Sequence, residues 1–161
     1  LYERHKMITY VGTDCQYLPT SMLKDAAHTI KGLSEMYRRE AIGANLDIVS
    51  KAWNDSKTDE HFAIAPTGKI ASGLNQAEKN VFEAVTRRFL AQFYPNHEFV
   101  KMRLQATFGR DEFRANDKAV TRNGWKDAEY GADGDATGEE LDAETMGEDD
   151  KDQARQRGAV E

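Results

Sequence analysis

The clearest element in the pattern of apolar and polar positions is a helix over residues 76–94. Its apolar residues recur at helical spacing and form one stripe: Val81, Phe82, Val85, Phe89 and Phe93. Asn75 stands at the N-cap position, and Glu78 three residues later completes a capping-box pattern. Pro95 cannot continue a helix, so it ends the element.

Helical spacing also predicts an earlier helix that starts at Pro19 and Thr20 and continues to Leu33. A second helix is predicted over residues 34–42, because Gly43 then interrupts the pattern. Ahead of both helices, the short β-branched and aromatic run at residues 7–11 predicts an extended segment.

Beyond Pro95 the period of the pattern changes from helical to two. Apolar residues alternate with polar ones at Val100, Met102, Leu104, Ala106 and Phe108. This alternation predicts a strand with one buried face. A turn at residues 109–112 and a returning strand over 113–120 complete a predicted β-hairpin.

Charge divides the chain into a mildly basic body and an acidic tail. Residues 1–126 hold 19 Lys/Arg and 15 Asp/Glu, a net charge of +4, whereas residues 127–161 hold 3 and 13, a net charge of −10. The tail offers few apolar side chains to bury, so its composition predicts disorder. The basic body is compatible with a partner that carries phosphate groups.

Other compositional features narrow the class of protein. Cys15 is the single cysteine, so no internal disulfide can form. No apolar run reaches membrane length and no signal peptide opens the chain, so we expect a cytoplasmic location and no membrane partner. The chain opens with Leu1 inside what reads as the end of a helix, and we therefore expect a segment of a longer polypeptide.

Three features carry candidate chemistry, and each has a structural alternative. Tyr10 lies at a strand-to-loop corner, where it is either a reactive group or a half-buried core tyrosine. His61 lies between a polar loop and an apolar island, where a histidine at the core edge is the alternative. Several cations form either a phosphate track or ordinary solvated helix faces: Arg4, Lys6, Arg38, Arg39, Arg87 and Arg88.

Three blocks of sequence resemble type IA DNA topoisomerases, most closely the topoisomerase III branch. They are MITYVGTDCQYLP at 7–19, SKAWNDSKTDEHFAIAPTG at 50–68 and LNQAEKNVFEAVTRRFLAQFYP at 74–95, in the family's order. The resemblance covers residues 1–95 as the active-site tyrosine domain and 96–126 as a β-hairpin of the adjoining gate domain. It does not cover residues 127–161, the expected acidic tail.

The resemblance implies a mainly α fold and a specific chemistry. The expected fold is a helical, winged-helix or catabolite-activator-like domain with a C-terminal β-hairpin and a disordered acidic tail. Tyr10 would attack a phosphodiester of single-stranded DNA and form a 5′-phosphotyrosyl bond, so that religation needs no ATP. His61 would hydrogen-bond the phosphate region and Asp14 would orient neighbouring groups. Arg4, Lys6, Arg87 and Arg88 are the candidate DNA contacts.

The remaining implications concern two features of the family that this chain lacks, a Toprim domain and an arginine after the tyrosine. The family binds Mg²⁺ through a Toprim domain, which nothing in residues 1–126 resembles, so we expect the Toprim and gate portions of the same polypeptide as partners. The family usually has arginine where this chain has Gly12, and we expect an open space there. One alternative is therefore a catalytically degenerate fragment that only binds single-stranded DNA. A second is an interaction protein with an acidic tail, unrelated to DNA.

Overall fold

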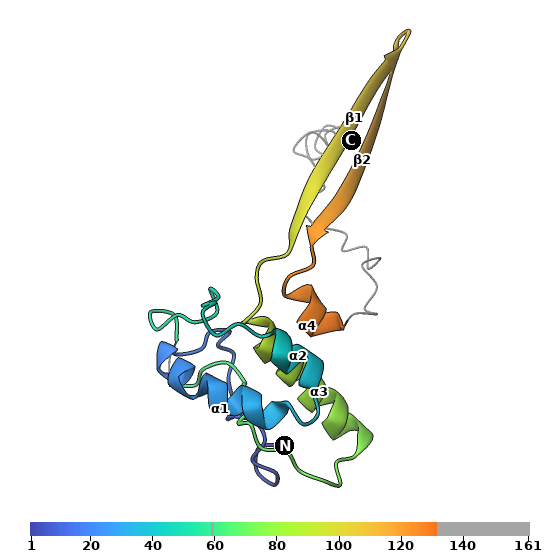
Figure 1. Ribbon diagram of the computed structural model, residues 1–161. Coiled ribbons are helices and arrows are strands. Elements are labelled where there is room, and N and C mark those ends of the chain that lie inside the picture. Colours follow the sequence, from blue (N-terminus) through green and yellow to red (C-terminus); the bar gives the residue numbers. More distant parts are fainter. Residues whose placement is uncertain (59, 132–161) are drawn as a thin grey trace, which may run out of the picture.

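The computed structural model describes residues 1–58 and 60–131, and the predicted disorder over 132–161 lies outside these residues. Helices gather in a body at one end of the molecule, and a long β-hairpin projects away from it (Figure 1). The elements in chain order are η1 Thr20–Met22, α1 Leu23–Leu33, α2 Arg38–Gly43, α3 Gln76–Ala91, β1 Glu98–Phe108, β2 Asp111–Arg122 and α4 Lys126–Tyr130.

The fold is mixed α/β, so the prediction of a mainly α fold is wrong. The two strands hold 11 and 12 residues, comparable with the 11 and 16 residues of the two longest helices. They pair in one antiparallel sheet. The prediction underestimated the hairpin, because β1 begins two residues before the predicted strand and β2 extends two residues beyond it at each end.

The core of the body lies between the helices and the long loops that connect them. α3 contributes the aromatic side chains Phe82 and Phe89, and Phe93 lies two residues beyond its end. α1 presents Ala26, Ile30 and Leu33 to the same core. Loops supply the rest, among them Met7, Ile8, Leu18, Trp53 and Ala65. The predicted stripe of α3 is confirmed at Phe82, Phe89 and Phe93, but Val81 at its start is 52% exposed.

The capping box of α3 is confirmed. The Asn75 side chain accepts a hydrogen bond from the Glu78 N–H at 2.9 Å, and the Glu78 carboxylate accepts from the Asn75 N–H at 2.8 Å. The helix ends at Ala91, earlier than predicted. The next N–H groups bond to carbonyls three residues back, as Phe93 does to Leu90 at 3.0 Å, and this tightens the last turn.

The first helix is confirmed as η1 continued by α1, whereas the second begins at Arg38 instead of residue 34. The Ser34 N–H still bonds to the Ile30 carbonyl at 3.0 Å, and the Tyr37 N–H bonds to the Leu33 carbonyl at 2.9 Å. These bonds form a turn between the helices. It brings the Tyr37 ring into the core beside Phe82, with ring centroids 6.2 Å apart.

α4 was not predicted and falls at the start of the stretch expected to be disordered. Its Ala128 is fully buried, and the Trp125 N–H just before the helix bonds to the Pro95 carbonyl at 2.9 Å. Gly124 makes this approach possible, because its φ is 58° and a Cβ there would overlap the carbonyl oxygens of Pro95 and Asn96. α4 thus fastens the base of the hairpin to the body.

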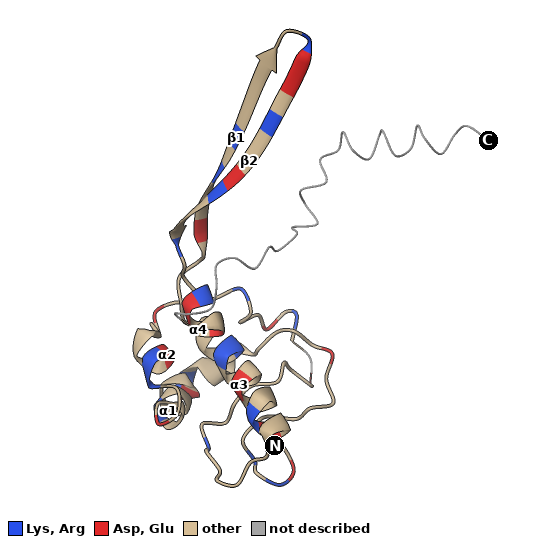
Figure 2. Cartoon of the chain, turned by 90° about the vertical axis from the view of Figure 1, so that its right-hand side faces the viewer, with Lys and Arg blue, Asp and Glu red and all other residues tan. Residues whose placement is uncertain are grey.

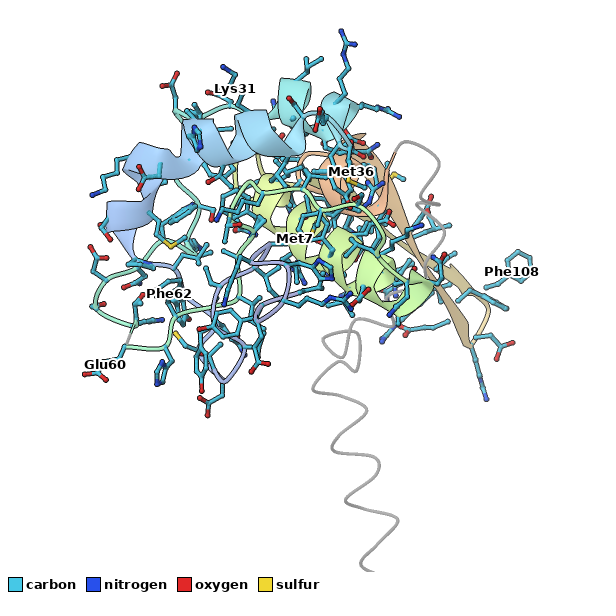
Figure 3. All side chains as sticks on the ribbon, turned by 90° about the horizontal axis from the view of Figure 1, so that it is seen from below. Met7, Lys31, Met36, Glu60, Phe62 and Phe108 are labelled. Atoms are coloured by element: carbon cyan, nitrogen blue, oxygen red, sulfur yellow. The ribbon has the colours of Figure 1, made fainter. Side chains whose placement is uncertain are left out.

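The β-hairpin itself is confirmed, but its predicted buried face is wrong. Pairing runs from Glu98 opposite Arg122 to Phe108 opposite Asp111, with Gly109 and Arg110 at the turn. Every residue of both strands is exposed. Phe108, at 83% exposure, points away from the helices at the far end (Figure 3). Alternation separated the two faces correctly, but nothing in the described part of the chain packs on the apolar one.

Candidate active site

Two segments far apart in sequence are joined by hydrogen bonds beneath Tyr10. The Thr9 N–H donates to the Ala65 carbonyl at 2.8 Å, and the Ala65 N–H donates back to Thr9 Oγ1 at 2.9 Å. The Thr67 N–H donates to the Met7 carbonyl at 2.9 Å. Met7 and Ile8 are buried, so the predicted extended segment is anchored in the core just before Tyr10 reaches the surface.

Tyr10 and His61, both assigned to the phosphate by the resemblance, lie together on one surface. Their ring centroids lie 4.9 Å apart with the planes tilted by 43°, and Tyr10 is 47% exposed. The Thr13 hydroxyl donates to the His61 carbonyl and accepts from the Cys15 N–H at 3.0 Å. Thr13 therefore ties the loop after Tyr10 to the residue that carries the imidazole. A core tyrosine would have no such exposed partner.

Tyr2 is a member of this cluster that the sequence did not single out. Its ring meets the Tyr10 ring edge-on, with centroids 5.6 Å apart. The Lys6 ammonium lies 5.3 Å from the centre of the Tyr2 ring. Lys6 itself adopts a left-handed backbone conformation with φ of 54°, and its carbonyl accepts a hydrogen bond from the Thr67 hydroxyl at 2.7 Å. No spacing rule relates these residues, so sequence patterning could not find the contact.

The expected open space at Gly12 is absent, because the Tyr10 ring occupies it. A Cβ on Gly12 would lie 2.5 Å from the Tyr10 hydroxyl oxygen and 2.7 Å from the ring carbon that bears it. Any other residue at this position must therefore move the phenol. The glycine lets Tyr10 fold back over the chain that follows it. That position depends on side-chain torsions, which the sequence does not encode.

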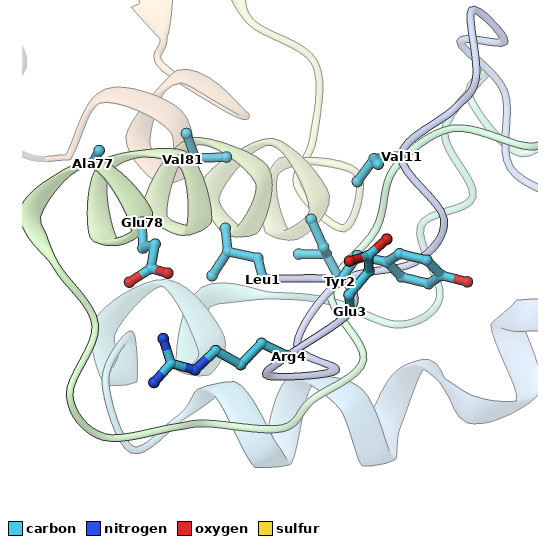
Figure 4. A pocket seen from close by; sticks show the side chains of 9 residues that line it. Leu1, Tyr2, Glu3, Arg4, Val11, Ala77, Glu78 and Val81 are labelled. Atoms are coloured by element: carbon cyan, nitrogen blue, oxygen red, sulfur yellow. The ribbon is translucent and has the colours of Figure 1, made fainter.

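Asp14 and Arg4 are both exposed near this region. The Asp14 carboxylate has no hydrogen-bond or ion-pair partner among residues 1–58 and 60–131, so the structure assigns no orienting contact to it. Arg4 lines an open groove of about 540 Å³ between the N-terminal segment and α3 (Figure 4). Leu1, Val11 and Val81 give this groove an apolar floor.

Arg87 and Arg88 are engaged with acidic side chains rather than presented as free cations. Arg87 pairs with Glu40 of α2 at 2.7 Å and with Glu83 at 2.9 Å, and it donates to the Ala128 carbonyl at 3.2 Å. Arg88 pairs with Glu129 of α4 at 2.9 Å. Both arginines thus link α3 to neighbouring helices, and their predicted DNA contact stays a prediction.

The electrostatics of the body follow from this packing. Burial raises the pKa of Tyr37, and the nearby Glu83 carboxylate raises it further. Burial likewise raises the pKa of Tyr94, whose hydroxyl donates to the Glu40 carbonyl at 2.9 Å. These two tyrosines stay protonated inside the helical packing and serve structure.

The described residues contain no group of three or more His, Cys, Asp and Glu side chains that could hold a metal ion. The magnesium implied by the resemblance therefore finds no fitting donor set in residues 1–58 and 60–131. None of the helices described is long and apolar enough to cross a membrane.

Comparison with known proteins identifies the family. A family model for DNA topoisomerases matches residues 1–158. The DNA topoisomerase 3 of Vibrio cholerae is 37% identical over 131 residues, covering 78% of this chain and 20% of the relative. Those of Haemophilus influenzae and Bacillus licheniformis are 30% and 31% identical and cover 79% and 88% of this chain and 20% of each relative.

The chain therefore belongs to the type IA DNA topoisomerase family. The relatives named DNA topoisomerase 3 confirm the topoisomerase III-like branch that the three sequence blocks predicted. The chain spans about a fifth of the length of these relatives.

Proposed function

We propose that this chain supplies the nucleophile of a topoisomerase III-like enzyme, which cleaves and rejoins single-stranded DNA to change its topology. The observation that carries the proposal is the Tyr10–His61 pair. The two rings lie 4.9 Å apart on an exposed surface, although a long stretch of chain separates them. A phenol beside an imidazole can place a nucleophile and a hydrogen-bonding group on one phosphate.

The proposed reaction is a transesterification. The Tyr10 oxygen attacks the phosphorus, the bond from phosphorus to the 3′ oxygen breaks, and a 5′-phosphotyrosyl bond forms. The phenolic proton leaves, and the released 3′ oxygen takes up a proton. His61 would donate to a phosphate oxygen and stabilise its growing charge. Because one ester replaces another, the reversal needs no ATP.

The proposal also includes partners outside the described residues. Mg²⁺ would be held by a Toprim portion of the same polypeptide, and when bound it would supply charge neutralisation at the phosphate. The gate portion would hold the DNA segment that passes through the break. Residues of this chain would position the scissile strand and provide the attacking oxygen.

A chimeric enzyme tests the proposal. Residues 1–126 replace the matching stretch of the Vibrio cholerae DNA topoisomerase 3, and the product meets single-stranded DNA labelled at either end. The proposal predicts covalent attachment of the 3′-labelled piece and release of the 5′-labelled piece. Tyr10→Phe removes the attacking oxygen and should abolish attachment, while Tyr17→Phe serves as the matched control. Attachment that persists with Phe at position 10 contradicts the proposal.

The second candidate function is single-stranded DNA binding without cleavage. Gly12 favours this non-cleaving function, because position 12 carries no guanidinium that could neutralise the phosphate. The Tyr10 ring occupies the space that a side chain at position 12 would need. Gly12→Arg in the same chimera should displace the ring and raise cleavage roughly 10-fold or more. If the chimera binds DNA but attaches none until Gly12 is replaced, the non-cleaving function holds for the natural sequence.

A further inference from the structure

The two faces of the hairpin differ in chemistry although both are exposed. Alternate residues of a strand lie on opposite faces, and residues directly opposite across the pair share a face. One face is largely apolar and carries Val100, Met102, Leu104, Ala106, Phe108, Phe113, Ala115 and Ala119. The other face, which we term the basic face, carries Phe99, Lys101, Arg103, Arg114 and Lys118. Figure 2 shows the charged bands along both strands.

Two lysines oppose each other on the basic face. Lys101 pairs directly with Lys118 in the strand register. Both ammonium groups lie against the Phe99 ring, at 5.7 Å and 4.1 Å from its centre. Like charges directly opposite one another in a sheet are destabilising. An anion that binds between the two lysines would relieve this repulsion and stabilise the hairpin.

Nearby carboxylates do not neutralise this pair. Glu112 pairs with Arg114 at 3.2 Å, and Glu98 pairs with Arg122 at 2.7 Å. Asp117 lies on the opposite face, where its carboxylate accepts from the Lys118 backbone N–H at 2.8 Å. Within the described residues, Lys101, Arg103 and Lys118 therefore have no acidic partner.

The order of cations along the strand matches a linear polyanion. Lys101 and Arg103 are two residues apart, so their Cα atoms are roughly 6.8 Å apart along β1. Phe99 continues the same face and is 38% exposed. Cations that track a backbone beside an aromatic ring on which a base can stack are the features of single-strand binding surfaces.

We propose that the basic face of the hairpin binds the phosphate backbone of single-stranded DNA, with Lys101, Arg103 and Lys118 as the contacts and Phe99 as a stacking surface. The identity of the polyanion, single-stranded DNA, rests on the proposed function. It adds a site away from Tyr10, on the element that extends from the body, and involves none of the cations proposed from the motifs.

Fluorescence anisotropy of a labelled 20-nucleotide thymidine strand with the full 161-residue chain tests the site. The variant Lys101→Gln/Arg103→Gln/Lys118→Gln removes three charges from the basic face. The control Lys24→Gln/Lys31→Gln/Lys51→Gln removes the same charge from exposed positions of the body. We expect roughly 10-fold weaker binding for the hairpin variant, and a salt slope smaller by about 2, from about 0.7 per phosphate contact. The control should change both values much less.

The outcomes are distinct. Equal losses in the two triple variants would mean that net charge alone attracts DNA, and this contradicts the proposed site. Equal affinity for the single strand and for a duplex of the same length contradicts the stacking role, and Phe99→Ala should weaken single-strand binding about 5-fold. The binding assay contains no cleavage step. A chimera that fails to attach DNA would therefore contradict the proposed function without contradicting the hairpin site, and a failed binding test would contradict the hairpin site alone.

Discussion

The body and the hairpin both have regular apolar patterns, yet only the body buries them. Phe82 and Phe93 of the body are 1% and 0% exposed, whereas Leu104 and Phe108 of the hairpin are 66% and 83% exposed. The period of a pattern determines which side chains share a face. Whether that face is covered depends on what lies opposite it, and the body supplies its own cover through α1, α3 and the loops.

The difference has an energetic consequence. An isolated two-stranded hairpin is marginally stable in water, because it lacks a second layer to bury its apolar face. Within the described residues the hairpin is held at its base, where the Trp125 N–H bonds to the Pro95 carbonyl at 2.9 Å and α4 bonds to Arg87 and Arg88 of α3. We propose that gate portions of the same polypeptide cover the apolar face.

The largest expected contrast comes from removing one phenylalanine in each region. Phe93→Ala should lower the free energy of unfolding by about 3–5 kcal/mol, because it leaves a cavity in the core. Phe108→Ala should change it by less than about 0.5 kcal/mol, because the exposed ring packs on nothing described. Urea denaturation followed by tryptophan fluorescence measures both. A comparable loss in the two variants would show that the hairpin is packed in solution.

A second contrast concerns how α4 is held to the body. Arg87→Ala leaves the mostly buried Glu40 carboxylate without its partner. We expect the free energy of unfolding to fall by about 2–3 kcal/mol, less than for a fully buried pair because part of Arg87 is solvated. Arg88→Ala removes an exposed pair and should cost about 0–1 kcal/mol. The side chains of Arg87 and Arg88 are 23% and 65% exposed. Thermal unfolding of the two variants measures the difference. Equal melting temperatures would contradict the larger contribution of Arg87 to stability.

Capping of α3 gives a smaller effect within the body. Asn75→Ala removes the acceptor for the Glu78 N–H and should destabilise the protein by about 1 kcal/mol. Asn80→Ala is the matched control, since among the described residues the Asn80 side chain bonds to the exposed Gln76 side chain alone, at 2.8 Å. Circular dichroism during urea unfolding measures both. Identical transitions would mean that the start of α3 contributes nothing to stability.

The smallest predicted effect is a dependence on acid. Hydrogen bonds from Thr20 lower the pKa of Asp55, and the Asn75 N–H lowers the pKa of Glu78. A depressed carboxyl pKa stabilises the fold at neutral pH, and this contribution is lost as the pH falls through about 4 and then through the folded-state pKa. Asp55→Asn/Glu78→Gln should therefore show a shallower loss of stability between about pH 5 and pH 3. Equal slopes would contradict these pKa shifts.

Local sequence information predicted much of the fold. α3 and its capping box follow from residues within one helix, and α1 follows from the spacing of its apolar side chains. The resemblance gave Tyr10 and His61 roles at the same phosphate, and the two rings do lie together. Such predictions succeed when the determining contacts lie within one element or one motif.

The features that sequence missed depend on distant contacts or on side-chain rotation. α4 forms where Arg87 and Trp125 hold an otherwise acidic stretch, and composition alone predicted disorder there. Arg87 forms an ion pair with Glu40 on another helix, although the sequence suggested a cation available for DNA. The Tyr10 ring turns onto Gly12 and fills a space that the resemblance suggested was open.

The most direct test of the central claim is to locate the DNA adduct on the protein. After covalent attachment in the chimera, nuclease digestion leaves a nucleotide on the attacking residue, and trypsin releases the peptide Met7–Lys24. Mass spectrometry should find the added mass on this peptide and assign it to Tyr10. An adduct on Tyr17 of the same peptide, or on Tyr2 in the peptide that ends at Arg4, would contradict the account.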